Sequence, residues 1–381
     1  MKKRVLLIGY MPPPYHGVVR MTEILKNSEL LNAEFDVEIF YIKAVDNAES
    51  RGKFAFKNIL LNLQNIIAFF VKCLFGKYDI LYLSMAQNNL GFIRDSLFVL
   101  IGKFFGIKIL ARYHAGDFIK SYEAKNQYLK SYIKYIYSKK IDKLIVLAEK
   151  IKKQFLNFID ERKLVVVYNF IEEIFIPAAL PAKDYQKKEI DILFVGYISK
   201  AKGAVDLVKA AKIVIQKLAE YKIRFLLAGD FVNIERNVVY IENPNGGYNE
   251  IIDYISKNSL EENIKLLGYI GDEAKKNLLA QSDLFVLPSY SEGFPVSVLE
   301  AMSYGLPMVL TSVGALDEVF ENEKKCLFSE IGNYQDLAEK ITKLILDIEL
   351  RKMMSENNYN AAKNVFNLKN YEQKIVELFN D

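Results

Sequence analysis

Short apolar runs rich in β-branched residues recur along the chain, and segments long enough to form helices separate most of them. Strands that alternate with helices form a parallel sheet with both faces covered, so the pattern predicts an α/β protein. The first set of runs comprises Val5–Ile8, Val37–Ile42, Ile80–Leu83, Ile107–Arg112, Lys143–Leu147 and Leu164–Val167. The second set comprises Ile192–Val195, Ile223–Ala228, Lys265–Leu267, Leu284–Leu287 and Met308–Leu310.

Two sets of strands imply two Rossmann-like, doubly wound domains, which also suits a length of 381 residues. The segment Ile171–Glu189 lies between the sets and contains Pro177 and Pro181, so we interpret it as a linker. We expect the first domain over residues 1–172, joined by a C-terminal helix at about 361–381, and the second domain over residues 190–360.

The chain has two cysteines, two histidines and no tryptophan. So few cysteines exclude a disulfide framework, and so few histidines exclude a His-rich metal centre. The apolar run Val5–Ile8 behind the basic start is too short for a signal peptide, and the charge-free stretch Asn58–Val71 is too short for a typical membrane span. We therefore expect a cytoplasmic protein. A peripheral position at the inner face of the cell membrane stays open.

Positive charge is concentrated in the first half of the chain. Residues 1–170 hold 27 Lys and Arg against 15 Asp and Glu, a net charge of +12, whereas residues 171–381 have a net charge of −8. We expect a negatively charged partner on the side of the first half, and no nucleic acid. An anionic membrane surface is one candidate, because Arg51–Lys77 and Lys120–Lys140 interleave Lys with aromatic and aliphatic residues. The alternatives are ordinary amphipathic packing and a compositional accident.

Ligands of open parallel sheets bind beyond the carboxyl ends of the strands, so the loops there are the candidates for chemistry. Gly17 opens the helix after the first strand, where free N–H groups can meet an anion; an ordinary Pro-rich turn is the alternative. His114 and Asp117 follow the fourth strand, where a functional role competes with plain packing of the histidine.

In the second half, Lys202 and Gly203 precede a helix after the strand Ile192–Val195. An ammonium group beside free helix amides is a good phosphate site, although a solvated lysine would give the same pattern. The sequence has neither the G-x-G-x-x-G order of dinucleotide-binding proteins after its first strand nor a Walker A loop at Lys202. Both absences weaken the case for a dinucleotide-dependent oxidoreductase or a P-loop enzyme.

The strongest signal lies between the strand Leu284–Leu287 and Pro307. Glu292 stands in the loop, Pro295 suits the first helical turn, and Glu300 lies roughly 7.5 Å further along the helix axis. Two carboxylates near one helix N-terminus can accept paired hydrogen bonds from the hydroxyls of a ribose or hexose, while the helix amides bind phosphate. A capped surface helix with two solvated glutamates is the alternative.

Glu292 and Glu300 form an E-x7-E pattern that resembles the retaining glycosyltransferases of family four, which have the GT-B fold. That resemblance implies two Rossmann-like doubly wound parallel-sheet domains facing across a cleft. Supporting matches run along the chain: Pro13–Gly17, His114–Asp117, Val167–Ile171, Lys202-Gly203, Leu227–Asp230, Leu267–Tyr269 and Thr311–Glu318.

The resemblance also implies roles for single residues. His114, Glu292 and Lys202 would be catalytic: His114 lines the reacting sugar, Glu292 meets its hydroxyls and Lys202 neutralises the diphosphate. The implied donor-binding residues are Gly17, Gly196, Tyr197, Lys202, Gly268, Tyr269, Ile270, Glu292, Gly293, Phe294, Pro295, Val296, Ser297 and Glu300, of which Glu300 holds the ribose. His16 and Asp117 fall on the acceptor side. Tyr197 stands where the family usually has Arg, so stabilisation of the leaving group rests on Lys202, helix amides and Lys200.

The resulting hypothesis is a retaining, metal-independent hexosyltransferase without a cofactor. It would move a hexose-type sugar from a nucleotide-diphospho sugar to a glycan or lipid-linked acceptor in cell-surface polysaccharide assembly. Two alternatives stay open. A non-catalytic nucleotide-sugar-binding protein is supported by Tyr197 alone. A nucleotide-sugar epimerase of the same fold would normally need more titratable groups than two histidines provide.

Overall fold

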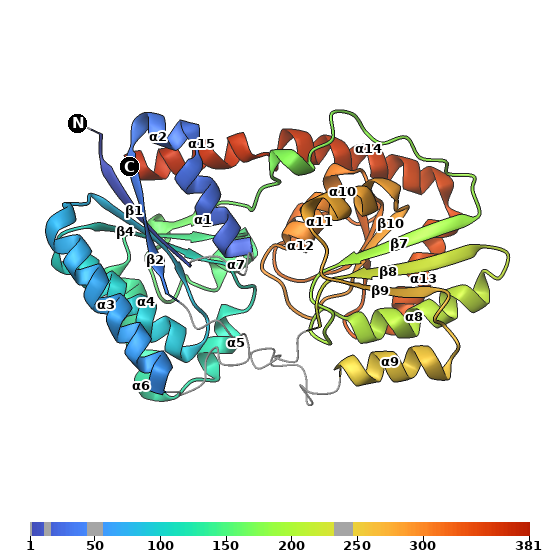
Figure 1. Cartoon of the computed structure of the whole chain (residues 1–381), viewed down its shortest axis with the longest axis horizontal. Coiled ribbons are helices and arrows are strands. Elements are labelled where there is room, and N and C mark those ends of the chain that lie inside the picture. The colour runs from blue at the N-terminus through green and yellow to red at the C-terminus, as the bar shows by residue number, and fades with distance from the viewer. Residues whose placement is uncertain (1, 11–16, 44–55, 232–246) are drawn as a thin grey trace. The chain divides into compact units, whose positions relative to one another are not determined.

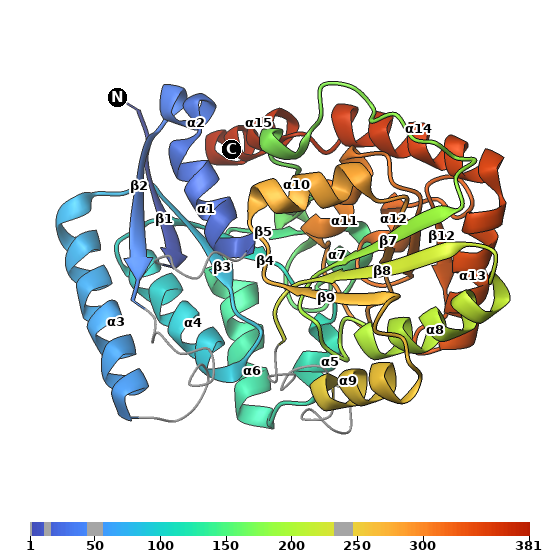
Figure 2. The ribbon, with the colours of Figure 1, turned by 45° about the vertical axis from the view of Figure 1, so that its right-hand side comes forward.

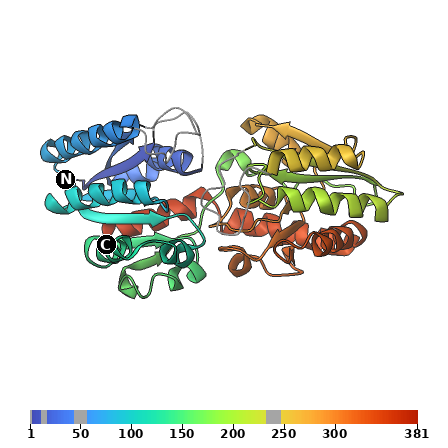
Figure 3. The same ribbon diagram turned by 90° about the horizontal axis from the view of Figure 1, so that it is seen from below.

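The computed structural model describes residues 2–10, 17–43, 56–231 and 247–381 (Figure 1). The described residues form two compact units, one made of residues 1–168 and 369–381 and the other of residues 169–368. Each unit contains a six-stranded parallel sheet, and helices cover both faces of each sheet (Figure 3). The predicted pair of Rossmann-like α/β domains is confirmed. The segment interpreted as a linker lies inside the second unit.

The sheet of the first unit has the strand order β2-β1-β3-β4-β5-β6. The strands read as near-continuous apolar runs because both of their faces are buried. Their bounds are Arg4–Tyr10 (β1), Asp36–Ile42 (β2), Ile80–Met85 (β3), Lys108–Tyr113 (β4), Lys143–Val146 (β5) and Leu164–Val166 (β6). The helices of this unit are Gly17–Asn27 (α1), Glu29–Glu34 (α2), Phe56–Gly76 (α3), Asn89–Phe104 (α4), Phe118–Glu123 (α5), Gln127–Tyr135 (α6) and Glu149–Lys153 (α7).

The last helix, α15 (Leu368–Asn380), returns to the first unit although it closes the chain. Arg112 of β4 is fully buried and donates a hydrogen bond of 2.9 Å to the hydroxyl of Tyr371. Phe379 packs edge to face against Phe35 with their ring centroids 5.3 Å apart. A buried guanidinium needs such partners, so these contacts attach α15 to the sheet.

The sheet of the second unit has the order β12-β11-β10-β7-β8-β9. Its strands are Glu189–Val195 (β7), Lys222–Ala228 (β8), Ile264–Gly268 (β9), Leu284–Leu287 (β10), Met308–Thr311 (β11) and Cys326–Ser329 (β12). Its helices are Ala204–Lys217 (α8), Gly247–Lys257 (α9), Asp272–Gln281 (α10), Val296–Ser303 (α11), Leu316–Val319 (α12), Tyr334–Leu346 (α13) and Ile348–Asn364 (α14). The strand β12, four residues at the sheet edge, was not predicted from the sequence.

One helix among the described residues is long and apolar enough, by length and composition, to cross a membrane. It is the Ile59–Gly76 part of α3, of which only 17% is buried. The expectation that the apolar stretches here are too short was wrong, because the run continues past its single charge, Lys72. Figures 1 and 2 show α3 running alongside α4 in the first unit.

Candidate functional site in the second unit

The loops that follow β7, β8 and β9 are joined by backbone hydrogen bonds at the carboxyl edge of the second sheet. Gly196 donates to Ala228 at 3.0 Å, and Gly229 donates to Gly268 at 2.8 Å. Gly229 has a φ of +143°, and a Cβ there would lie 1.9 Å from the carbonyl oxygen of Gly196. Only glycine fits this approach, so the loops form one continuous rim.

Lys202 and Glu292, which the sequence places 90 residues apart, form an ion pair of 2.5 Å between Nζ and Oε1. Ser289 donates to the same carboxylate oxygen at 2.8 Å. The α8 cap, Gly203, has a φ of +72°, and a Cβ on it would come within 2.0 Å of the Pro288 carbonyl oxygen. The glycine therefore lets the loop before α8 contact the loop before α11. Glu292 is buried, which rules out the alternative of a solvated glutamate.

Glu300 lies in the second turn of α11 and is 4% exposed. Its Oε1 is 2.7 Å from Nζ of Lys275 on α10. The same ammonium stands 4.1 Å from the ring centroid of Phe175. The carboxylate is thus both desolvated and charge-compensated, and it is not the solvated surface group of the alternative interpretation.

The loop between Ser289 and Pro295 is fixed by contacts from three directions. Ala315 donates its N–H to the carbonyl of Gly293 at 2.8 Å, and the Asn169 amide donates to the carbonyl of Phe294 at 2.7 Å. Thr311 donates to the carbonyl of Ser289 at 2.5 Å. These bonds fix the backbone of the loop that carries Glu292.

The α11 helix begins at Val296, one residue later than expected, with Pro295 at the cap position. The first-turn amides of Val296 and Ser297 lie next to the loop of Glu292, and helix N-terminal amides favour anions. At the ends of β7 and β9, the rings of Tyr197 and Tyr269 are exposed, while Ile270 is half-buried.

A further side-chain hydrogen bond stabilises the same region. The Tyr290 hydroxyl donates to a carboxylate oxygen of Asp206, on α8, at 2.7 Å. Burial raises the pKa of Asp206 above its ordinary value, against the hydrogen bond from Tyr290, which lowers it. This bond ties the first turn of α8 to the loop after β10.

Three residues of this site were not predicted from the sequence to have a role: Lys275, Asn169 and Ser289. No sequence motif indicates a role for Lys275, because its partner Glu300 lies on another helix. Asn169 was noted only as part of a resembling segment, and its amide in fact holds the backbone of Phe294. Ser289 could have been found, because it stands three residues before Glu292 in the same loop.

The predicted residues of the first unit lie at the carboxyl edge of the other sheet. The Nε2 of His114, after β4, is 3.0 Å from the Ser84 hydroxyl on β3. The backbone carbonyl of Asp117 accepts a hydrogen bond of 3.0 Å from Gln87. Gly17 begins α1. His16 lies outside the described residues.

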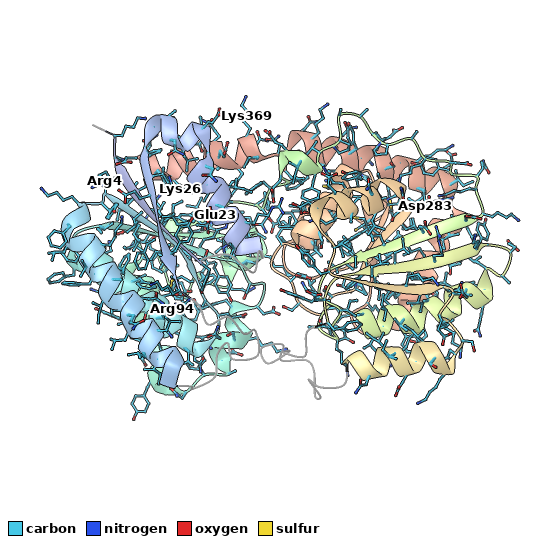
Figure 4. The ribbon with its side chains drawn as sticks, viewed as in Figure 1. Arg4, Glu23, Lys26, Arg94, Asp283 and Lys369 are labelled. Carbon is cyan, nitrogen blue, oxygen red and sulfur yellow. The ribbon has the colours of Figure 1, made fainter. Side chains whose placement is uncertain are left out.

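Arg94 was not predicted, although it occupies the same edge of the first sheet (Figure 4). It pairs with Asp95, which is buried, at 2.6 Å. Its guanidinium also donates to the hydroxyl of Tyr10, at the end of β1. The Asp95 carboxylate in turn accepts the N–H of Ala86 at 2.8 Å. This network joins the ends of β1 and β3.

Within the described part of the chain, no group of three or more His, Cys, Asp or Glu side chains is placed to hold a metal ion.

Comparison with known proteins relates the second unit to a family. Residues 178–361 match the model of the glycosyl transferases group 1. The UDP-Gal:alpha-D-GlcNAc-diphosphoundecaprenol alpha-1,3-galactosyltransferase of Escherichia coli is 27% identical over 231 residues, which cover 59% of this chain and 56% of that protein. The chain spans about half the length of the first curated relatives that it matches.

Two solved structures extend the likeness to both units. Sucrose-phosphate synthase from Thermosynechococcus elongatus has a TM-score of 0.77 at 16% identity, covering 100% of this chain and 98% of that one. Anabaena HepE in complex with UDP has a TM-score of 0.72 at 18% identity, covering 100% of both chains. The expected resemblance is confirmed: residues 178–361 match the glycosyl transferases group 1, and the chain as a whole has the GT-B fold of these structural neighbours.

Proposed function

We propose that this chain is a retaining glycosyltransferase that moves a hexose-type sugar from a nucleotide-diphospho sugar. The observation that carries the proposal is the Lys202–Glu292 pair, held by Ser289 beside the N-terminus of α11. It joins a carboxylate that can bind sugar hydroxyls with an ammonium that can bind phosphate. The buried Glu300 carboxylate on the same helix is the partner for ribose hydroxyls.

In the proposed reaction, the bond between the anomeric carbon and the diphosphate oxygen breaks, and its electron pair stays on the nucleoside diphosphate. The acceptor hydroxyl oxygen bonds to that carbon, and its proton passes to the departing phosphate oxygen. Lys202 has three donors, so it can keep Glu292 and still donate to phosphate. Together with the amides that begin α8 and α11, it stabilises the charge that develops, in the place of a metal. His114 and Gly17 keep the roles that the resemblance implies.

We further propose a glycan or lipid-linked acceptor in cell-surface polysaccharide assembly, reached from the cytoplasmic face of the membrane. The name of the Escherichia coli relative states that it acts on a diphosphoundecaprenol-linked sugar. The net charge of +12 in residues 1–170 favours an anionic membrane surface or an anionic acceptor.

The test is a panel of labelled nucleotide-diphospho sugars, with and without lipid-linked acceptors. We expect release of nucleoside diphosphate with one donor and a product that keeps the anomeric configuration by NMR. Glu292→Gln should abolish most of the release, whereas Glu321→Gln, at an exposed position of the same unit, should not. Donor binding without release would instead support the non-catalytic binding protein. Conversion of one free nucleotide-sugar into another would support the epimerase.

A further inference from the structure

The helix α3 has its polarity reversed relative to a helix that faces water. Among residues Ile59–Gly76, every exposed side chain except Gln64 is apolar. Of the other polar side chains, Asn65 is buried, and Asn62 and Lys72 are half-buried. A surface helix of a water-soluble domain normally shows the opposite distribution.

The inward face explains how α3 is held. Asn65 is buried and exchanges two hydrogen bonds with the backbone of Lys43, at 3.0 and 3.1 Å. Phe69 is buried and packs edge to face on Phe98 of α4, with their centroids 4.9 Å apart. Lys72 reaches Glu38 of β2 at 2.5 Å. These contacts fix the helix against the sheet, so the outward face is a stable surface.

The outward face is a long apolar strip, which we call the α3 strip. Its members are Ile59, Leu60, Leu63, Ile67, Phe70, Val71, Leu74 and Phe75. From Ile59 to Phe75 it runs about 24 Å along the helix axis. At the end of α4, Phe104 extends it: this ring is 76% exposed and lies 6.4 Å from the ring of Phe70. A contiguous apolar surface of this kind marks an interaction site.

We propose that the α3 strip inserts in the plane of a lipid bilayer, below the headgroups, as a monotopic anchor. The segment Ile59–Gly76 is apolar enough to qualify as a membrane span, so its exposed side chains are suited to contact with lipid hydrocarbon. Protein–protein interfaces are on the whole no more apolar than other surfaces and have a polar rim, whereas every member of the α3 strip is apolar and Gln64 is the one exposed polar residue of Ile59–Gly76. The +12 charge of the first half favours anionic lipid beside it.

The topology argues that α3 lies along the membrane and does not cross it. The helix connects β2 to β3, and both strands pair in parallel with β1. Three residues separate the end of α3 from β3, and Arg4 at the start of β1 donates to the Gly76 carbonyl (Figure 4). The C-terminal end of α3 is therefore attached to the sheet, and Asn65 attaches the middle of the helix to Lys43, directly after β2. A helix with an apolar face of this type typically sinks about 5–10 Å into the interface.

The chain offers a direct probe because it contains no tryptophan. Phe75 is 79% exposed on the α3 strip, and Leu346 is 52% exposed on α13 of the second unit. In Phe75→Trp we expect the emission to shift to the blue on adding phosphatidylcholine–phosphatidylglycerol vesicles, and lipids brominated in the acyl chain to quench it. In Leu346→Trp we expect neither change. Equal quenching of both variants, or of neither, overturns the proposal.

A flotation experiment measures how much the apolar side chains of the α3 strip contribute to the affinity for vesicles. The variant Leu63→Ser, Ile67→Ser and Leu74→Ser should lower the vesicle partition coefficient at least about tenfold, because it removes apolar area from the lipid. The matched control is Ile331→Ser, Leu346→Ser and Met353→Ser, three exposed apolar positions of the second unit. It should float like the parent chain. A parent chain that stays at the bottom with all vesicles rejects the bilayer as the occupant.

A second copy of the chain is the competing occupant. It would give a concentration-dependent dimer by sedimentation, with Phe75→Trp already blue-shifted in the absence of lipid, and that result would contradict the proposal. The proposal deepens the proposed use of a membrane-borne acceptor. Its probes measure lipid contact without turnover, while transfer to a soluble acceptor analogue tests the enzyme separately.

Discussion

Lys275 compensates the buried charge of Glu300, and its contribution to the stability of the fold can be measured. Removing one partner of a buried ion pair leaves an uncompensated charge and costs about 3–5 kcal/mol. We expect Lys275→Met to lower the free energy of unfolding by about that amount in urea at pH 7. The double variant Lys275→Met, Glu300→Leu should recover most of the loss, because it removes both charges.

The adjacent Lys276 provides the control, since its partner Glu273 is largely exposed. Exposed pairs contribute at most about 1 kcal/mol, so Lys276→Met should change stability little. Equal losses in the two single variants would contradict the view that burial makes the Lys275–Glu300 pair important.

Lys202 supports a prediction about activity. Loss of one preorganised contact to developing charge typically costs about 2.7–4 kcal/mol in the barrier. With a confirmed donor, we expect Lys202→Ala to lower kcat at least about tenfold. The parent chain should keep its rate in EDTA. Loss of the parent's activity in EDTA, restored by Mg²⁺ or Mn²⁺, would show that a metal carries the role assigned to Lys202.

At the scale of single residues, the sequence could predict the site residues that share one short segment. Glu292 and Glu300 stand on a single loop and helix, so their spacing implied that they serve one ligand. It could not predict that Lys202 would pair with Glu292, because the contact depends on the close approach of Gly203 to Pro288. The role of Lys275 could not be predicted from the sequence, because it depends on how α10 packs beside α11.

At the scale of elements, the attachment of α3 to β2 should depend on pH. Lys72, with further hydrogen bonds from Tyr78 and Arg4, lowers the pKa of Glu38 from 4.5 to about 2. A carboxyl with a lowered pKa in the folded state stabilises the fold above its unfolded pKa. That stability is lost as pH falls from about 4.5 towards about 2.

We therefore expect Glu38→Gln to be less stable than the parent chain at pH 7, by about 1 kcal/mol because the site is partly exposed. The difference should shrink steadily between about pH 4.5 and pH 3 in urea titrations. Glu349→Gln, which removes a pair with Lys352 on the surface of α14, should show no such trend. A constant difference across this range would mean that the charge of Glu38 does not hold α3.

Most elements could be predicted because parallel strands buried on both faces are continuous apolar runs. The short edge strand Cys326–Ser329 could not, since its four residues carry no period of their own and become a strand only by pairing with β11. For α3, the apolar composition was visible in the sequence. That its polar residues face inward could not be, because the burial of Asn65 depends on the backbone of Lys43.

At the scale of the whole molecule, the unequal charge of the two halves should divide membrane binding into two parts. Each basic residue near an anionic surface contributes about 1 kcal/mol, and the field decays over a Debye length of about 8 Å at physiological salt. Insertion of the α3 strip does not depend on this field. We therefore expect anionic vesicles to bind more of the chain than neutral ones at low salt, and both to bind equally at about 1 M salt.

The charge variant for this prediction is Lys134→Gln with Lys139→Gln, two exposed lysines of the first unit. It should weaken binding to anionic vesicles at low salt and leave binding to neutral vesicles unchanged, because only the electrostatic part is removed. Lys217→Gln with Lys222→Gln in the second unit is the matched control and should behave as the parent chain, since the second half of the chain has a net charge of −8. If 1 M salt releases the chain from all vesicles, the electrostatic part acts alone. In that case the α3 strip must be covered by something other than lipid.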